Sequence, residues 1–160
     1  MAQSKLPYFR KVDLPESAKS VLNTCYGKWD YFMSSVPALD SLGKHIGWEY
    51  SDVIKGDFND DQSIDYAVLV RTFDSLESHQ GNLIVLFGQG NRFTTQVVYS
   101  GYYNSDNVLY LQEKGKTIED FETRKYIELP VDAIESAIFE KTATTYYFKD
   151  GFFHEIGTGD

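Results

Sequence analysis

Cysteine and histidine are both scarce in this sequence. Cysteine occurs once in 160 residues, at Cys25, and the three histidines, His45, His79 and His154, lie far apart. One cysteine cannot form an internal disulfide, and these residues lack the spacing of a zinc site. Cys25 lies on an apolar helical face without an activating neighbour in sequence, so we expect a small buried side chain there rather than a nucleophile.

Positive charge is also scarce. The 15 Lys and Arg residues are outnumbered by 24 Asp and Glu residues, which gives a formal net charge of −9. Nucleic acids and anionic membrane surfaces are bound by clustered Lys and Arg, so the balance argues against both as partners. An acidic surface is compatible with a bound cation, with a basic protein partner, or with solubility alone.

Long hydrophobic runs are missing. No window approaches 18 consecutive apolar residues, so we expect no transmembrane helix. The first residues, MAQSKLPYF, lack the basic and apolar regions of a signal peptide. Ala2-Gln3-Ser4 would suit the edge of a signal-peptidase cut. We therefore expect a periplasmic or secreted protein if this is a mature chain, and a cytoplasmic one otherwise.

Familiar catalytic motifs are absent as well. The sequence contains no G-x-S-x-G, no H-E-x-x-H and no G-x-x-x-x-G-K-[ST]. The glycine-rich stretch Gly88-Gln89-Gly90-Asn91 lies between two expected strands, so it indicates a hairpin turn and not a phosphate loop. We expect no enzyme, and a hydrolase with dispersed, unrecognised residues is an alternative.

Aromatic residues are abundant and favour β structure. They make up 16% of the chain, with 12 Tyr and 11 Phe. Leu14-Pro15-Glu16-Ser17 has the features of a helix start, and an apolar helical face follows as far as Gly27. We expect a single α+β domain. Its parts are an extended arm over 1–13, a helical segment over 14–47 and a twisted, mainly antiparallel β-rich segment over 48–160.

Alternating patterns and turn residues predict nine strands. They are expected at 48–56, 65–73, 82–88, 92–100, 107–112, 125–129, 133–141, 144–149 and 152–157, with 113–124 as a solvated loop. Asp150-Gly151 predicts a type I′ hairpin turn between the last two strands. We expect one face of this hairpin in the core and the other partly covered by the N-terminal helix or arm.

One stretch, GDFNDDQSIDYAVLV over residues 56–70, concentrates acid directly before an apolar strand. Carboxylates held together repel one another more strongly as water is excluded, so a counter-charge is expected. Numbered from its first Asp, oxygen-bearing side chains fall at positions one, three, five and nine, and a backbone carbonyl at position seven is available. Ca²⁺ takes six to eight such hard oxygen ligands. The candidate metal ligands are Asp57, Asn59, Asp61, Ser63 and Asp65.

The loop resembles the calcium loop of FG-GAP/VCBS-type repeats, as found in integrin α-subunit propellers. Their pattern is roughly G-D-[FLV]-N-x-D-G-x-x-D-[LY]-[AV]-V. The residues that fit are Gly56, Asp57, Phe58, Asn59, Asp61, Asp65, Tyr66, Ala67 and Val68, whereas Gln62 replaces the usual Gly. The resemblance implies a Ca²⁺ site. It differs from an EF-hand, which needs flanking helices and a Glu where this chain has Val68. A single copy does not imply a propeller or integrin-like adhesion.

A second candidate region is rich in tyrosine. Tyr102, Tyr103, Asp106 and Tyr110 lie around residues 100–107, and exposed aromatics with amides and acids suit the recognition of sugars or proteins. A tyrosine-rich sheet packed on both faces is the alternative. Together the features indicate a calcium-binding β-rich binding or interaction protein. An acidic inhibitor or immunity-type protein that covers a basic partner is a further alternative.

Overall fold

The computed structural model describes residues 12–32, 52–72, 80–103, 107–138 and 142–159. Most of the segment 28–47, where a second helix is expected, lies outside these ranges. The candidate Asp106 also lies outside them. In chain order the elements are α1 (Glu16–Tyr26), β1 (Trp29–Tyr31), β2 (Val53–Gly56), β3 (Asp65–Thr72), β4 (Gln80–Gln89), β5 (Arg92–Tyr102), β6 (Asn107–Gln112), β7 (Thr117–Glu119), β8 (Tyr126–Glu128), β9 (Ala133–Ile138), β10 (Thr142–Lys149) and β11 (Phe152–Gly159).

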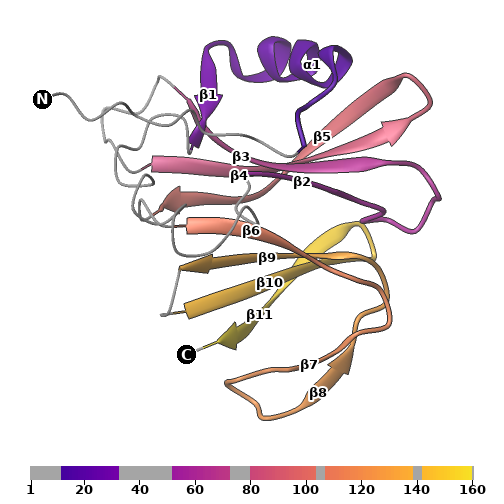
Figure 1. Cartoon of the computed structure of the whole chain (residues 1–160), viewed down its shortest axis with the longest axis vertical. Coiled ribbons are helices and arrows are strands. Elements are labelled where there is room, and N and C mark those ends of the chain that lie inside the picture. Colours follow the sequence, from indigo (N-terminus) through magenta and orange to yellow (C-terminus); the bar gives the residue numbers. More distant parts are fainter. Residues whose placement is uncertain (1–11, 33–51, 73–79, 104–106, 139–141, 160) are drawn as a thin grey trace, which may run out of the picture.

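The strands form two stacked sheets with α1 on one outer face (Figure 1). The first sheet has the order β1-β3-β4-β5, with β2 beside the first half of β3, and the second has the order β11-β10-β9-β6. A separate hairpin pairs β7 with β8. Every described pair is antiparallel, so the expected helix followed by antiparallel strands is confirmed.

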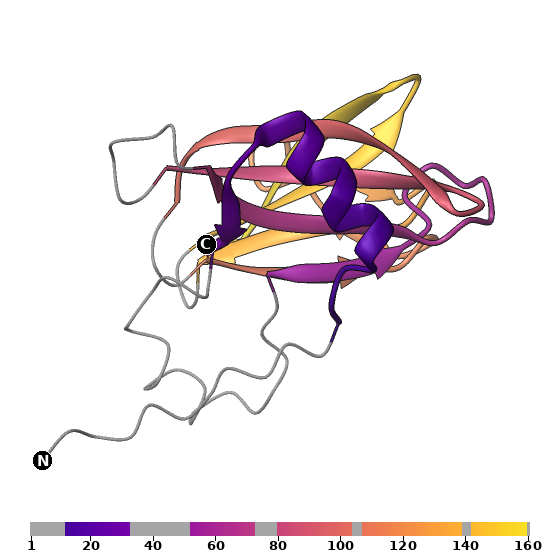
Figure 2. The ribbon, with the colours of Figure 1, turned by 90° about the horizontal axis from the view of Figure 1, so that it is seen from above.

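Helix α1 covers the outer face of the first sheet, and Figure 2 shows it lying diagonally across the strands. It begins after Pro15, which has an extended conformation, and ends at Tyr26 before Gly27. Its buried residues Ala18 and Leu22 lie one turn apart and pack on the strands. Cys25 is exposed, because the buried stripe of this helix does not extend to it, so the expectation of a buried cysteine is wrong.

The main core lies between the two sheets. Successive residues of a strand point to opposite faces, so β3 and β4 are buried on both sides: one set meets the second sheet and the other meets α1. This explains the almost purely apolar run after the acidic loop. The residues of β3 and β4 that face the second sheet are Ala67, Leu69, Leu83, Val85 and Phe87.

The β7–β8 hairpin covers the outer face of the second sheet. Ile118 of β7 packs with Ala133 and Ile156, and Tyr147 of β10 lies against the same cluster. The expectation of a solvated loop over 113–124 is therefore wrong in part, since β7 lies inside it and its Ile118 is buried. The expectation that the N-terminal helix or arm covers this face is wrong for the helix, because α1 packs on the first sheet. Residues 1–11 of the arm lie outside the described residues.

The hairpin between β10 and β11 turns where the sequence predicts. Lys149 pairs with Phe152, and the two residues between them, Asp150 and Gly151, have φ angles of 54° and 85°. Positive φ at both positions is what a type I′ turn requires. Phe148 packs in the core between the sheets. The segment expected to be helical also contains a strand, β1, which pairs with the second half of β3.

None of the helices in the described ranges is long and apolar enough to cross a membrane.

Truncation of the chain after Asp150 should abolish a cooperative thermal transition. It removes β11, which supplies the buried Ile156 and pairs with β10 from Ala143 to Lys149. Calorimetry or circular dichroism measures the transition. The control is Phe152→Ala, because that side chain is 68% exposed and its loss should change the free energy of unfolding by less than about 0.5 kcal/mol. A truncated protein with a sharp two-state melt would show that β11 is peripheral.

Candidate calcium loop

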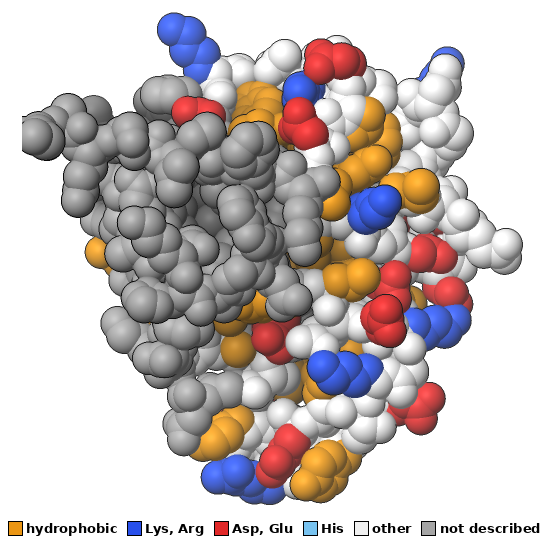
Figure 3. All heavy atoms as spheres, viewed as in Figure 1, with side chains coloured by type: hydrophobic (Ala, Val, Ile, Leu, Met, Phe, Trp, Pro, Cys, Tyr) orange, Lys and Arg blue, Asp and Glu red, His pale blue; other side chains and the backbone are white. Residues whose placement is uncertain are grey.

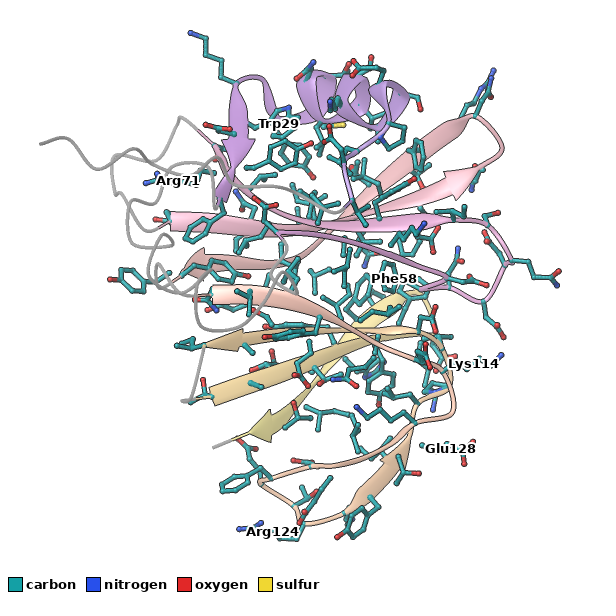
Figure 4. All side chains as sticks on the ribbon, in the orientation of Figure 1. Trp29, Phe58, Arg71, Lys114, Arg124 and Glu128 are labelled. Atoms are coloured by element: carbon teal, nitrogen blue, oxygen red, sulfur yellow. The ribbon has the colours of Figure 1, made fainter. Side chains whose placement is uncertain are left out.

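The acidic loop connects β2 to β3 at one end of the two-sheet sandwich. Gly56 and Asp65 pair across the two strands that it joins. Phe58, the second residue of the loop, is fully buried in the core between the sheets, whereas Asp60, Asp61 and Gln62 are exposed. Figure 4 shows Phe58 between the sheets and Lys114 at the edge where the loop lies. The loop is thus fixed by an aromatic anchor while its tip stays open to solvent.

Side-chain oxygens of the loop accept hydrogen bonds from the loop's own backbone. The Asp61 N–H donates to Asp57 Oδ1 at 3.0 Å and the Gln62 N–H donates to Asp57 Oδ2 at 2.9 Å. The Ser63 N–H donates to Asp61 Oδ1 at 2.8 Å, and this bond lowers the pKa of Asp61. The chain therefore curls around Asp57, which keeps the alternating oxygen-bearing side chains on one short segment.

Two residues of the tip have a left-handed backbone. Asp60 has φ of 60° and Gln62 has φ of 67°. Asp tolerates this region because its short side chain bonds locally, but a longer side chain with a Cβ is strained there. Gln62 occupies the position at which the calcium-loop pattern has Gly. A positive φ at this position is the conformation that Gly adopts without strain.

Asp65 closes the loop from within the protein. Its side chain is buried, and its two oxygens accept hydrogen bonds from the N–H groups of Phe58 and Gly88, each at 2.8 Å. Burial raises the pKa of Asp65 to about 6, against the effect of these two bonds, and the charges of Asp61 and Asp57 raise it further. This carboxylate joins the start of the loop, the end of the loop and the end of β4.

Asp132, which precedes β9, makes a second brace to the loop. Its two oxygens accept hydrogen bonds from the N–H groups of Asp57 and Lys114, at 3.0 and 2.9 Å. The Lys114 ammonium also contacts both carboxylate oxygens of Asp60 at 2.8 Å. The loop, which belongs to the first sheet, is thereby tied to two connections of the second sheet.

The charge of the loop exceeds the positive charge around it. Of its four carboxylates, Asp60 is paired with Lys114, while Asp57, Asp61 and Asp65 form no ion pair in the described part of the chain. The side-chain amide of Asn59 donates to Asp61 Oδ2 at 3.0 Å. The positive end of this amide dipole offsets part of the negative charge of Asp61, and a cation at the same place would offset more of it. Such a donor set of carboxylates and an amide suits a hard cation.

The structure describes all five predicted ligands, Asp57, Asn59, Asp61, Ser63 and Asp65, and brings them onto one nine-residue turn. Among the described residues, no group of three or more His, Cys, Asp or Glu side chains has an arrangement that could hold a metal ion. Instead, the carboxylate oxygens of Asp57, Asp61 and Asp65 accept hydrogen bonds from backbone N–H groups, and Asp61 also accepts one from the Asn59 amide. That they converge on one centre remains a prediction.

Sequence reasoning did not identify the residues that brace the loop. Asp132, Lys114 and Gly88 are distant in sequence and belong to no motif. The one available signal was Gly88, which the sequence placed both at the end of the strand expected over 82–88 and at the start of a turn; it lies inside β4. A Cβ at Gly88 would lie 2.3 Å from the Ile64 carbonyl oxygen, so Gly is needed where β4 passes the loop.

The tyrosine-rich region lies at another part of the molecule. Tyr102 is 63% exposed at the end of β5, but Tyr103 is only 4% exposed and packs against Phe32 and Tyr99. Burial raises the pKa of Tyr103, so its hydroxyl stays protonated. Tyr110 follows Leu109 on β6 and therefore points to the opposite face from the core between the sheets. The expectation of one exposed aromatic group is thus wrong for Tyr103.

Comparisons of the chain with protein-family models, with curated proteins and with solved structures find no match. The assignment of a function therefore depends on the loop and on the pockets of the fold themselves.

Replacing Gln62 by Gly should stabilise the metal-free protein by about 1 kcal/mol, because Gly adopts a positive φ without strain. Urea unfolding in EDTA measures the change. The matched control is Gln89→Gly at the end of β4, which has no positive φ and should lose up to about 1 kcal/mol. Equal destabilisation by both substitutions would show that the loop carries no strain at Gln62.

Gly88→Ala should destabilise the protein by about 1–3 kcal/mol, because the added methyl group meets the Ile64 carbonyl and pushes the loop away from β4. The same unfolding experiment measures the loss. Gly157→Ala is its control, since a Cβ at Gly157 has no heavy atom within 4 Å and the residue has no positive φ. If the two variants unfold alike, the close contact between β4 and the loop does not exist in solution.

Proposed function

We propose that this chain is a calcium-binding, β-rich binding or interaction protein, and that residues 57–65 hold one Ca²⁺ ion in the manner of an FG-GAP-type loop. One observation carries the proposal. Three carboxylates, Asp57, Asp61 and Asp65, occupy one turn without an ion pair in the described part of the chain. Keeping three such charges together is unfavourable unless a cation neutralises them.

The donor types present suit a hard cation, and binding requires that their oxygens turn toward one centre, which they do not share in the structure. Asp57, Asn59, Asp61 and Asp65 would contribute side-chain oxygens, and Ser63 would contribute its carbonyl, which is a usual set for calcium. The bound ion would supply positive charge at the edge of the sandwich. Asn59 would then present its amide oxygen in place of its NH₂ group, and the backbone N–H bonds to the outer carboxylate oxygens would orient the side chains.

A structural role for the ion is favoured over a catalytic one. The loop is braced through Asp65 to β4 and through Asp132 to the second sheet, so an ion in it would stabilise the contact between the two sheets. Catalysis by a metal requires an open coordination position and a base near it. Asp132, the carboxylate that the second sheet places beside the loop, accepts backbone N–H groups with both of its oxygens, so it is not placed as a base.

The alternatives receive less support. An acidic inhibitor would present a continuous acidic face, but Figure 3 shows Asp and Glu beside Lys and Arg on the face that it presents. A hydrolase would combine a deep pocket with groups that act as acid, base or nucleophile. Of two pockets in the described part of the chain, one lies beside the loop and is lined by Asp60, Glu128, Lys149 and Asp150, and the other is lined by Glu155. Neither has a His or Cys among its described residues.

Calcium should raise the melting temperature of the protein above its value in EDTA. A ligand that binds only the folded state adds about 2.7 kcal/mol at a hundredfold excess over its Kd. Titration calorimetry of EDTA-stripped protein should show one site. Asp61→Ala should abolish both effects, because it removes a ligand at the exposed tip of the loop.

The matched control for this titration is Asp120→Ala. Asp120 also accepts N–H bonds from residues two and three positions later, but it lies in the β7–β8 turn, far from the loop in sequence. This variant should keep the full calcium response. Absence of binding to the wild-type protein at millimolar Ca²⁺ would refute the proposal, and an unchanged response in Asp61→Ala would place the ion elsewhere.

A further inference from the structure

A cavity opens between the two sheets. It has a volume of about 320 Å³, at the small end of the range for ligand pockets. Residues of β5 form one wall, and residues of the second sheet form the other. The lining residues that matter here are Tyr99, Tyr103, Asn107, Ser136, Tyr146 and Glu155.

The cavity and the calcium loop lie at opposite ends of the sandwich. The cavity is lined by the last residues of β5 and β9 and by the first residue of β6. The loop contacts the far ends of the same sheets, at Gly88, Lys114 and Asp132. Figure 1 shows the end of β5 and the start of β6 across the molecule from the turn between β2 and β3. The cavity is therefore a separate site.

Tyr103 supplies the observation that points to a ligand. Its side chain is 4% exposed and lines the cavity, and its hydroxyl finds no hydrogen-bond partner in the described part of the structure. A buried hydroxyl without a partner is unfavourable, and most such groups in folded proteins are satisfied. No other buried side-chain oxygen or nitrogen of the described residues is left in this state. The hydroxyl oxygen itself has almost no exposed surface, so a ligand has to displace the Tyr103 ring slightly to reach it and remove the penalty.

The sheet is shaped to place this ring. Gly81 and Gly101 pair across β4 and β5 on the face toward the second sheet. A Cβ at Gly81 would lie 2.8 Å from Tyr103 Cδ2, and one at Gly101 would lie 2.8 Å from the Tyr99 hydroxyl. The paired glycines thus make room for the two rings, which meet edge to face with 5.7 Å between centroids. Tyr99 is 41% exposed, so part of its ring stays open to an incoming ligand.

We propose that this cavity binds one neutral sugar ring. The exposed parts of the Tyr99 and Tyr102 rings offer apolar surface for the C–H groups of a pyranose, and the hydroxyl and amide groups of Tyr103, Ser136 and Asn107 match its hydroxyls. The Glu155 carboxylate is an acceptor for sugar hydroxyl donors. The volume suits a single ring and not an extended chain.

The lining disfavours other small ligands. It includes no described Lys, Arg or His, so an anion would find no counter-charge. Aromatic rings beside Glu155 would attract an organic cation such as choline. Choline, however, offers a single hydroxyl, whereas a sugar ring offers several to the hydroxyl and amide groups of Tyr103, Ser136 and Asn107.

Ligand-observed NMR and titration calorimetry with methyl glycosides of glucose, galactose, mannose and N-acetylglucosamine test the proposal, with choline chloride as comparator. A ligand of this size should bind in about the millimolar range. At least one glycoside should bind, and choline should not. Tyr103→Phe should weaken that binding about fivefold without lowering the melting temperature, because the hydroxyl it removes has no partner in the free protein.

Tyr126→Phe is the matched control, since Tyr126 is 73% exposed on β8 and does not line the cavity. It should leave binding unchanged, and Glu155→Gln should weaken it about tenfold. Failure of all four glycosides to bind would overturn the proposal. Equal affinity in wild type and Tyr103→Phe would overturn it too, and binding of choline alone would assign the cavity to organic cations.

Discussion

The buried carboxylate of Asp65 is the interaction on which this end of the protein depends. One oxygen holds the N–H of Phe58 at the start of the loop, and the other holds the N–H of Gly88 on the neighbouring strand. A neutral side chain of the same shape could not accept both bonds. This one group therefore ties the start of β3 to the buried Phe58 at the start of the loop and to Gly88 of β4.

The same carboxylate explains why the loop favours a cation. Desolvation makes the charge on Asp65 unfavourable, as its raised pKa shows, and Asp57 and Asp61 add to the unfavourable potential. Backbone N–H groups donate hydrogen bonds to these carboxylates, and the Lys114 ammonium pairs with Asp60. Dipoles and a distant ammonium offset only part of three negative charges. A divalent ion would offset the remainder and would strengthen the joint between the sheets.

Much of the fold could be predicted because patterns of neighbouring residues in the sequence determine it. Alternation located most strands to within a few residues, and Asp150-Gly151 set the last hairpin, since both are properties of neighbouring residues. Long-range partners could not be read in this way. Nothing near Asp132 or Lys114 in sequence indicates that they brace a loop more than fifty residues earlier. Tyr103 looked like its exposed neighbour Tyr102, because only the packing of two sheets distinguishes them.

Amide NMR spectra recorded in EDTA and in calcium test the central claim, that the braced loop holds the ion, most directly. The N–H groups of Phe58, Asp61, Gln62, Ser63 and Gly88 all donate to carboxylates of the loop. Calcium should shift these five resonances and slow their hydrogen exchange, while the amides of the β10–β11 hairpin stay unchanged. Loop resonances that do not respond to millimolar calcium, or shifts confined to another part of the chain, would contradict the account.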